Sequence, residues 1–187
     1  MPSHIIHPIP PVFDADSRIL ILGSFPSVKS RESCFFYGHP QNRFWKLLAR
    51  LRKEDVPSSI EEKKEFLLRN HIAVWDTIHS CSIEGSSDSS IRDVVPNDLA
   101  SILDHASIQA IYTNGGLSGK MYDRFCCKQT GIEAIKLPST SPANAAWNLD
   151  RLTDAWKCIN QILGKPGSET KNTASDGNAR EAKTRII

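Results

Sequence analysis

The sequence lacks three features that would mark a membrane, secreted or disulfide-rich protein. No apolar run approaches the ~20 residues that span a bilayer. The N-terminus, MPSHIIHPIPPVF, has four prolines and no basic segment before a continuous apolar core, unlike a signal peptide. The five cysteines are odd in number and show no Cys-x-x-Cys spacing, so they predict no disulfide framework. We therefore expect a soluble, intracellular protein of a reducing compartment, cytoplasmic or, in a eukaryote, nuclear.

Common cofactor-binding motifs are also missing. The sequence contains neither G-x-x-x-x-G-K-[ST] nor G-x-G-x-x-G, so binding of a nucleoside triphosphate or a dinucleotide is not predicted. No Cys/His spacing suits a zinc or iron–sulfur site. We therefore expect no cofactor and no metal. The chain has 187 residues, which is long enough for one globular domain.

The sequence also has almost no excess of positive or negative charge. The formal net charge is +2, and residues 164–187 hold five Lys/Arg against three Asp/Glu, which leaves 18 of each in the rest of the chain. Composition thus argues weakly against nucleic-acid binding, which depends on phosphate neutralisation. The exception is residues 28–53, where seven basic residues accompany Glu32 as the one acidic residue. This cluster indicates either contact with a DNA backbone or a solvated helix face.

Short apolar runs alternate with segments of helical periodicity. The runs cover 18–22, 72–78, 108–113 and 132–137. Helices are expected from about Asn42, from Ser59, and over 98–106, 116–127 and 145–163. The helix at Ser59 begins with a Ser59/Glu62 capping box. This alternation predicts an α/β fold with a four-stranded parallel sheet in a three-layer α/β/α arrangement.

Three regions of the chain are distinguished by composition. The proline-rich residues 1–17 are expected to form an N-terminal arm that lies on the fold. Residues 18–164 are expected to form a single catalytic domain. Residues 165–187 lack aromatic side chains and are rich in small polar residues, so we expect a disordered tail.

Polar and aromatic segments follow the four predicted strands: GSFPS, WDTIHS, YTNGG and LPSTSPANA. In a parallel sheet all carboxyl ends face the same way, and ligands bind there. We therefore expect the four segments to converge on one crevice. The longest of them, residues 23–45, combines flat rings, a basic cluster and the amide of Asn42. That combination can hold a nucleobase.

Two motifs carry a resemblance to a known family. GSFPS and FYGHPQNRFW, within residues 23–45, and LPSTSPANA at 137–145 resemble the uracil-DNA glycosylase superfamily, in particular its hypoxanthine-DNA (deoxyinosine) glycosylase branch. The likeness covers residues 17–163. It implies a monomeric, metal-independent enzyme that flips a deaminated base out of DNA and hydrolyses its N-glycosidic bond, which starts base-excision repair.

Asn42 has two interpretations. Asparagine is a favoured helix N-cap, and Asn42 stands just before an expected helix. The resemblance implies instead that the Asn of HPQNRFW is catalytic, either orienting a water or donating to the departing purine. The position that holds a catalytic Asn or Asp in other branches is occupied here by the apolar Phe25. A polar catalytic group must therefore come from another position.

The resemblance also implies a base pocket made of Tyr37, Asp76, Phe25 and Ser24. Tyr37 matches an aromatic position on which a flipped base stacks. An ionised Asp76 accepts hydrogen bonds and would suit the N1–H of hypoxanthine, with a salt bridge or helix cap as an equal interpretation.

Residues 137–145 resemble a loop that enters the DNA minor groove. Its small hydroxyls and exposed backbone would bind phosphates, or the segment is simply a proline-punctuated turn. Asn114 and Gly115, at a helix start, would offer N–H groups to a phosphate or only cap the helix. The residues assigned to DNA contact are Ser27, Lys29, Arg43, Asn114, Gly115, Pro138, Ser139, Thr140 and Ser141.

The predicted activity is therefore removal of hypoxanthine from DNA by a monofunctional glycosylase that has no obligate protein partner. Two alternatives stay open. One is a glycosylase directed mainly at uracil. The other is a non-catalytic, flavodoxin-like module that binds a nucleotide or a protein through the same crevice, which would fit the neutral body of the chain.

Overall fold

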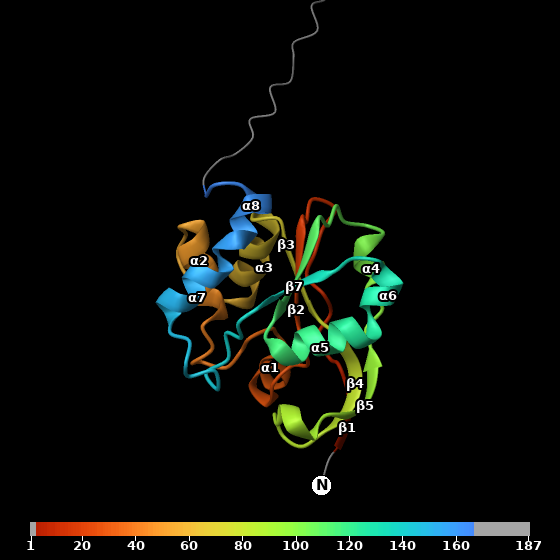
Figure 1. Cartoon of the computed structure of the whole chain (residues 1–187). Helices are drawn as coiled ribbons and strands as arrows, with labels where there is room; N and C mark the ends of the chain where they lie inside the picture. The colour runs from red at the N-terminus through yellow and green to blue at the C-terminus, as the bar shows by residue number, and fades with distance from the viewer. Residues whose placement is uncertain (1–2, 167–187) are drawn as a thin grey trace, which may run out of the picture.

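The computed structural model describes residues 3–166 and has a four-stranded parallel sheet at its centre (Figure 1). The strands lie in the order β3-β2-β6-β7, with bounds Ile72–Asp76, Ile19–Gly23, Ala110–Asn114 and Ala134–Leu137. All three pairings are parallel, and Ile21 stands opposite Val74 on one side and Tyr112 on the other. The predicted α/β fold and its four parallel strands are confirmed.

Helices cover both faces of this sheet, which gives three layers (Figure 1). One face carries α2 (Phe44–Arg52), α3 (Ile60–Arg69), α7 (Leu149–Trp156) and α8 (Asn160–Leu163). The other carries α4 (Ala100–Leu103), α5 (Gly116–Phe125) and α6 (Cys127–Thr130).

Strand β2 supplies both cores. Successive side chains of a strand point to opposite faces, so Ile19 and Ile21 enter one core and Leu20 and Leu22 enter the other. All four are fully buried. Burial on both faces explains why this strand is a continuous apolar run in the sequence.

A second, antiparallel sheet is not among the sequence predictions. Its strands lie in the order β1-β4-β5, with bounds Ser3–Ile6, Ile78–Ile83 and Arg92–Pro96. The predicted strand over 72–78 is thus two strands, because the chain turns at Thr77, whose N–H donates to the carbonyl of Gly23 (2.8 Å). Most side chains of β1 and β5 are exposed, so neither strand carries an apolar signal.

The final helix differs from its prediction over 145–163. It begins at Leu149, because the side chain of Asn148 caps it by accepting a hydrogen bond from the N–H of Arg151 (2.9 Å). A 3₁₀ turn at Lys157–Ile159 then separates α7 from α8.

Two further helices also differ. The helix expected over 98–106 is reduced to the single turn of α4. A short helix that was not predicted, α1 (Val28–Ser33), follows Ser27, whose side chain caps it. The capping box of Ser59 and Glu62 at the start of α3 is confirmed.

The N-terminal arm lies against both sheets. Strand β1 pairs with β4, and the N–H of His7 donates to the carbonyl of His79 (2.6 Å). Further along, Val12 forms an antiparallel bridge with Val74 of β3. The arm therefore crosses from the small sheet to the large one.

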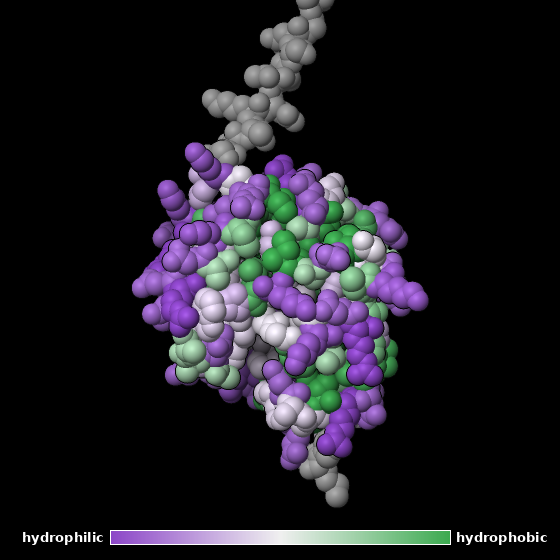
Figure 2. Space-filling model, viewed as in Figure 1, coloured by the Kyte–Doolittle hydropathy of each residue, from purple (hydrophilic) through white to green (hydrophobic). Residues whose placement is uncertain are grey.

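The described residues end at position 166, so the tail predicted for 165–187 lies almost wholly outside them. Within residues 3–166, no helix is long and apolar enough to cross a membrane. Hydrophilic side chains cover much of the face shown in Figure 2. This face is hollowed between α1 and the start of α5, and side chains of intermediate hydropathy surround the hollow.

Candidate active site

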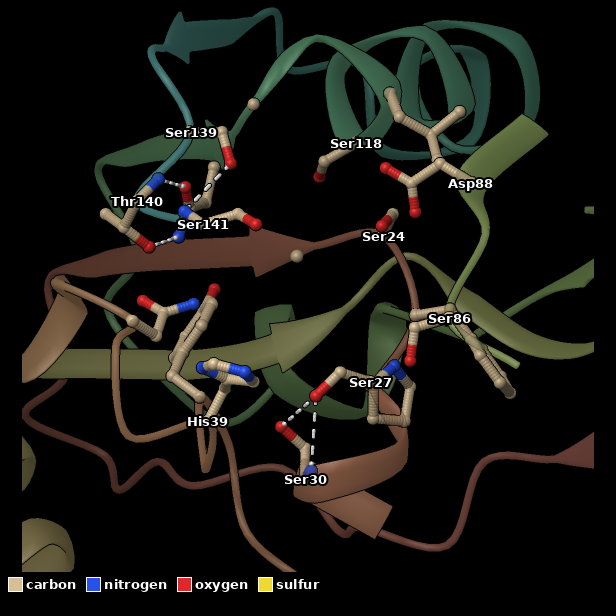
Figure 3. A pocket seen from close by; sticks show the side chains of 18 of the residues that line it. Ser24, Ser27, Ser30, His39, Ser86, Asp88, Ser118, Ser139, Thr140 and Ser141 are labelled. Atoms are coloured by element: carbon tan, nitrogen blue, oxygen red, sulfur yellow. Dashed lines mark hydrogen bonds between the residues drawn. The ribbon is translucent and has the colours of Figure 1, made fainter. Parts of the chain in front are cut away.

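A cavity of about 490 Å³ opens at the carboxyl ends of the parallel strands (Figure 3). All four segments that were predicted to converge there contribute to its lining, as the parallel sheet requires. The predicted site residues that line it are Ser24, Phe25, Ser27, Lys29, Tyr37, Asn42, Asp76, Asn114, Gly115, Ser139, Thr140 and Ser141. Pro138 and Arg43 do not belong to this lining.

The carboxamide of Asn42 is divided between the helix and the cavity. Its Oδ1 accepts a hydrogen bond from the N–H of Phe44 (3.0 Å), so the side chain satisfies the first backbone donor of α2 from the position before the N-cap, Arg43. Its Nδ2 has no hydrogen-bond acceptor among residues 3–166. Because the cap bond fixes the orientation of the amide, the two N–H donors remain available to a ligand in the cavity.

Tyr37 combines a strained backbone with a buried hydroxyl. Its φ of 52° lies in the left-handed region, which is rare for an aromatic residue and is a conformation that functional sites often hold. One ring face stacks on Phe44, with centroids 3.8 Å apart.

The Tyr37 hydroxyl is buried and forms no hydrogen bond of normal geometry within residues 3–166. Burial raises its pKa, and the nearby Asp76 raises that pKa further, against a smaller opposite effect from Asn114. The hydroxyl therefore remains a protonated, unused donor at the cavity.

Asp76 is held at the bottom of the cavity. Asp76 is 4% exposed, and its Oδ2 lies 2.7 Å from Nε2 of His7. The side chain of Asn97 donates to its backbone carbonyl (2.8 Å). The neighbouring strand makes room for the carboxylate with a glycine, because a β-carbon added at Gly23 would lie 2.1 Å from Asp76 Oδ1. Asp76 therefore has a structural partner in His7 and a place in the lining of the cavity at the same time.

Phe25 and Ser24 begin the loop after β2. The Phe25 ring packs against the small sheet and meets the His7 ring edge-on, with centroids 5.8 Å apart. Ser24 accepts a backbone hydrogen bond from Ile78 at its carbonyl (3.0 Å), and its side chain lies in the cavity (Figure 3). This loop therefore joins the large sheet to the small one.

Arg43 has hydrogen-bond partners within the protein. It was assigned to DNA contact, but its guanidinium donates to backbone carbonyls of the loop that precedes α7. Its Nε donates to Thr140 (3.2 Å), and its other nitrogens donate to Ser141, Asn144 and Trp147. The donors that a phosphate would need are thus engaged. Arg43 positions this loop against the residue next to it, Asn42.

Asn114 and Gly115 also have structural partners. Asn114 forms two hydrogen bonds with Thr140, one from its Nδ2 to the hydroxyl (2.9 Å) and one to its Oδ1 from the backbone N–H (3.0 Å). The N–H of Gly115 donates to the carbonyl of Leu137 (2.8 Å), so it is not a free anion donor. The φ of 100° at Gly115 explains the glycine, since other residues rarely adopt it. These contacts favour the capping and scaffolding interpretation.

The hydroxyls of the 139–141 segment shape their own turn (Figure 3). Ser139 accepts from the N–H of Ser141 (3.1 Å), and Ser141 accepts from the N–H of Ala143 (3.2 Å). A hydroxyl that accepts still has its own hydrogen to donate. These side chains line the cavity, so their assignment to DNA stays a prediction, whereas Pro138 offers a carbonyl that is already bonded to the indole of Trp156 (2.9 Å).

Ser27 and Lys29 lie on the opposite side of the cavity. The Ser27 hydroxyl accepts from the N–H of Ser30 (3.2 Å) as the cap of α1. Lys29 pairs with Glu32 at 2.9 Å, but both side chains are 58% exposed. Such exposed pairs contribute little, so the pair leaves Lys29 free to exchange Glu32 for a phosphate.

Several lining residues escaped sequence analysis. Ser86 and Asp88 come from the segment between β4 and β5, and Asp88 points into the cavity from the side of the small sheet (Figure 3). His7 reaches Asp76 from the arm, across 69 positions of sequence. Sequence spacing predicts neither the 86–88 segment nor His7, because both are positioned by the antiparallel sheet, which the sequence analysis did not predict. Among residues 3–166, no group of three or more His, Cys, Asp or Glu side chains is arranged to hold a metal.

Comparison with known proteins agrees with this geometry. The sequence model of the uracil DNA glycosylase superfamily matches residues 10–163. The chain belongs to this superfamily. Two similar proteins are called hypoxanthine DNA glycosylase. The one from Methanosarcina barkeri is 37% identical over 137 residues, 72% of this chain and 85% of the relative. The one from Methanosarcina acetivorans is 35% identical over 152 residues, 80% of this chain and 94% of the relative.

A solved structure extends the likeness to three dimensions. The solution NMR structure of a Methanosarcina acetivorans protein, described as a candidate uracil DNA glycosylase, matches with a TM-score of 0.71 and 34% identity. The match covers 83% of this chain and 96% of that protein. Superfamily membership does not favour the non-catalytic, flavodoxin-like alternative.

Proposed function

We propose that this protein is a monofunctional DNA glycosylase that removes hypoxanthine from DNA. Water would add to C1′ of deoxyinosine as the bond to the purine nitrogen breaks, which releases hypoxanthine and leaves an abasic site. The proposal is supported by superfamily membership and by the activity for which two relatives are named. We further propose that it acts as a monomer, without metal or cofactor, in the cytoplasm or, in a eukaryote, the nucleus.

The observation that carries this proposal is the divided carboxamide of Asn42. Oδ1 already accepts a hydrogen bond from the helix, whereas Nδ2 has no acceptor among the described residues, so both amide hydrogens are available to donate. A departing purine gains electron density as its glycosidic bond breaks. A preorganised N–H donor at that point stabilises the transition state more than the ground state. Of its two possible catalytic roles, this favours donation to the leaving base over orientation of a water by Oδ1.

Binding of DNA would place the target nucleotide in the cavity and leave the backbone at its rim. A base must leave the helical stack before a site of this depth can reach it. Ser139 and Ser141 on one side of the cavity and Lys29 on the other carry the donors for flanking phosphates. Tyr37 would contact the flipped base, and Phe25 and Ser24 would close the pocket around it.

A gel assay with oligonucleotides tests the proposal. The purified protein is incubated with duplexes that contain deoxyinosine, deoxyuridine or no damage, in the presence of EDTA, and each product is treated with alkali. We expect strand cleavage after alkali for deoxyinosine above all, and no cleavage without alkali. Intact deoxyinosine strands would contradict the proposal, and faster reaction of deoxyuridine would assign the enzyme to uracil. Trapping of a covalent adduct with borohydride would contradict the monofunctional assignment.

A further inference from the structure

His7 links the N-terminal arm to the bottom of the cavity. It follows β1 and lies outside residues 10–163, the part that the superfamily model matches. Its side chain is 1% exposed, and its Nε2 lies 2.7 Å from Oδ2 of Asp76. A residue of the arm is therefore a direct partner of Asp76, a buried carboxylate of the cavity lining.

The main chain fixes both the position and the tautomer of His7. Its backbone N–H donates to the carbonyl of His79 (2.6 Å), which anchors it to β4. The N–H of Ile9 donates to Nδ1 (3.2 Å), so Nδ1 is the acceptor nitrogen of the ring. Nε2 therefore carries the hydrogen and donates it to Asp76.

Aromatic rings keep this hydrogen bond away from water. The His7 ring has Phe25, Phe36 and Trp75 as neighbours, at centroid distances of 5.8, 6.4 and 6.4 Å. A hydrogen bond in such surroundings is stronger than one in water, and a carboxylate that loses its partner there is costly. Asp76 is consequently held in one rotamer.

Oδ2 of Asp76 is bonded to His7, and Oδ1 has no hydrogen bond within residues 3–166, so Oδ1 is the oxygen available to a ligand. Oδ1 lies over Gly23, and the unpartnered hydroxyl of Tyr37 lies on the same side, 3.4 Å from where a β-carbon of Gly23 would be. The bottom of the cavity thus offers one acceptor beside one donor. Hypoxanthine has the complementary edge, an N1–H beside a C6 carbonyl. Adenine has the reverse, a bare N1 beside an amino group.

We infer that His7 is a positioning residue that sets the base selectivity of the site by holding Asp76 as an acceptor. The inference rests on the proposed function. Without His7, no side chain holds the Asp76 carboxylate in this orientation, and it can turn away from the base. A displaced carboxylate no longer accepts from N1–H, so the site would lose its preference for a base with N1–H over one with a bare N1. The arm would then act on selectivity without touching the base.

The test compares two bases in each variant. His7→Phe keeps an aromatic ring but removes the donor, and His7→Gln keeps a donor. His4→Phe is the matched control, because His4 is an exposed residue of the same arm. Single-turnover excision is measured for deoxyinosine and for deoxynebularine, whose purine has a bare N1 and no carbonyl. Melting curves confirm that each variant folds.

We expect His7→Phe to excise hypoxanthine about 10- to 100-fold more slowly, as a misplaced group would. We also expect its preference for hypoxanthine over purine to fall at least tenfold, whereas His7→Gln and His4→Phe stay within about threefold of the wild type. An unchanged preference in folded His7→Phe would overturn the inference. If His7→Phe does not melt cooperatively, His7→Ala takes its place in the same comparison.

A double-mutant cycle separates positioning from a direct role. If His7 acts only through Asp76, adding His7→Phe to Asp76→Asn should change the excision rate by less than about threefold. Full additivity would show that His7 acts independently and would overturn the inference. Absence of hypoxanthine excision by the wild-type protein would contradict the proposed function instead, so the two failures are distinguishable.

Discussion

The parallel sheet is buried on both faces, whereas the antiparallel sheet leaves most of β1 and β5 exposed. The first supplies both cores and carries Asn42, Tyr37 and Asp76 at its carboxyl edge. The second has a small core of its own and supplies Ile83, Ser86 and Asp88 to the cavity, with His7 bonded to β4. Stability is therefore expected to depend on the large sheet, and selectivity on the small one. Substitutions that change either the free energy of unfolding or the excision rate, but not both, test this assignment.

The largest effect is expected in the parallel sheet. Ile21→Ala removes a fully buried side chain at the centre of β2, and such substitutions cost about 2–5 kcal/mol of unfolding free energy. Val95→Ala in β5 is the control, because Val95 is 49% exposed and should change that free energy by less than about 0.5 kcal/mol. Urea unfolding monitored by circular dichroism measures both. Similar losses at the two positions would show that the small sheet shares the main core.

Gly23→Ala should uncouple fold from function. The new β-carbon would lie 2.1 Å from Asp76 Oδ1, so the carboxylate must move out of the position in which it accepts a hydrogen bond. We expect hypoxanthine excision to fall about 100-fold, equivalent to about 2.7 kcal/mol of barrier. Gly116→Ala is the control for a glycine-to-alanine change in the same cavity lining that leaves Asp76 in place, because a β-carbon there meets nothing within 4 Å. Equal single-turnover rates for wild type and Gly23→Ala would mean that Asp76 does not contact the base.

Tyr37→Phe should lower activity and not stability. The ring keeps its stacking on Phe44, while a buried hydroxyl without a partner is removed, so the melting temperature should stay the same or rise. Excision of hypoxanthine should slow about tenfold, or about 1.4 kcal/mol of barrier, because the donor to its carbonyl is lost.

The Tyr37 hydroxyl also leads to a prediction about the pH dependence of excision. Because burial and Asp76 raise its pKa, it stays protonated where a solvent-exposed tyrosine ionises, near pH 10. The excision rates of the wild type and of Tyr37→Phe should therefore change with pH in the same way near pH 10. A loss confined to the wild type would show that Tyr37 ionises in the ordinary range.

The smallest effect is expected at the exposed rim. Lys29→Ala should weaken binding to deoxyinosine duplex a few-fold and reduce the salt dependence of that binding by roughly one phosphate contact. Lys157→Ala is the matched control, because Lys157 forms a comparable exposed pair with Asp154 away from the cavity. Fluorescence anisotropy at several salt concentrations measures both. Identical salt slopes for the two variants would remove Lys29 from the DNA interface.

Prediction of the fold from sequence succeeded where burial leaves a pattern. The parallel strands are apolar runs because they are covered on both faces, and α3 is marked by its capping box. The outer strands of the second sheet, β1 and β5, leave no such pattern, since most of their side chains are exposed. The final helix starts late for two reasons. Asn148 caps it through a local hydrogen bond, and Arg43 holds the preceding loop through a contact that spans 104 positions.

The residues at strand ends do line one cavity, because topology brings these ends together, and their functional roles stay predictions. Sequence analysis failed to predict the partners that come from elsewhere. The contact of His7 with Asp76 spans 69 positions, and the occupation of Arg43 by loop carbonyls depends on tertiary structure. A basic residue beside a DNA-binding motif suggests phosphate contact, and only the folded chain shows that its donors are taken.

The most direct test concerns the amide of Asn42. Asn42→Asp keeps a cap for Phe44, since aspartate caps as well as asparagine, but it replaces the donor with a negative charge beside the leaving base. Asn148→Asp is the matched control, a cap of α7 outside the cavity. Both variants should melt like the wild type. Single-turnover excision of hypoxanthine should fall at least tenfold for Asn42→Asp, with about 100- to 1000-fold typical for loss of one such group, and stay unchanged for Asn148→Asp. A folded Asn42→Asp protein that excises at the wild-type rate would contradict a catalytic role for Asn42 and leave it a helix cap.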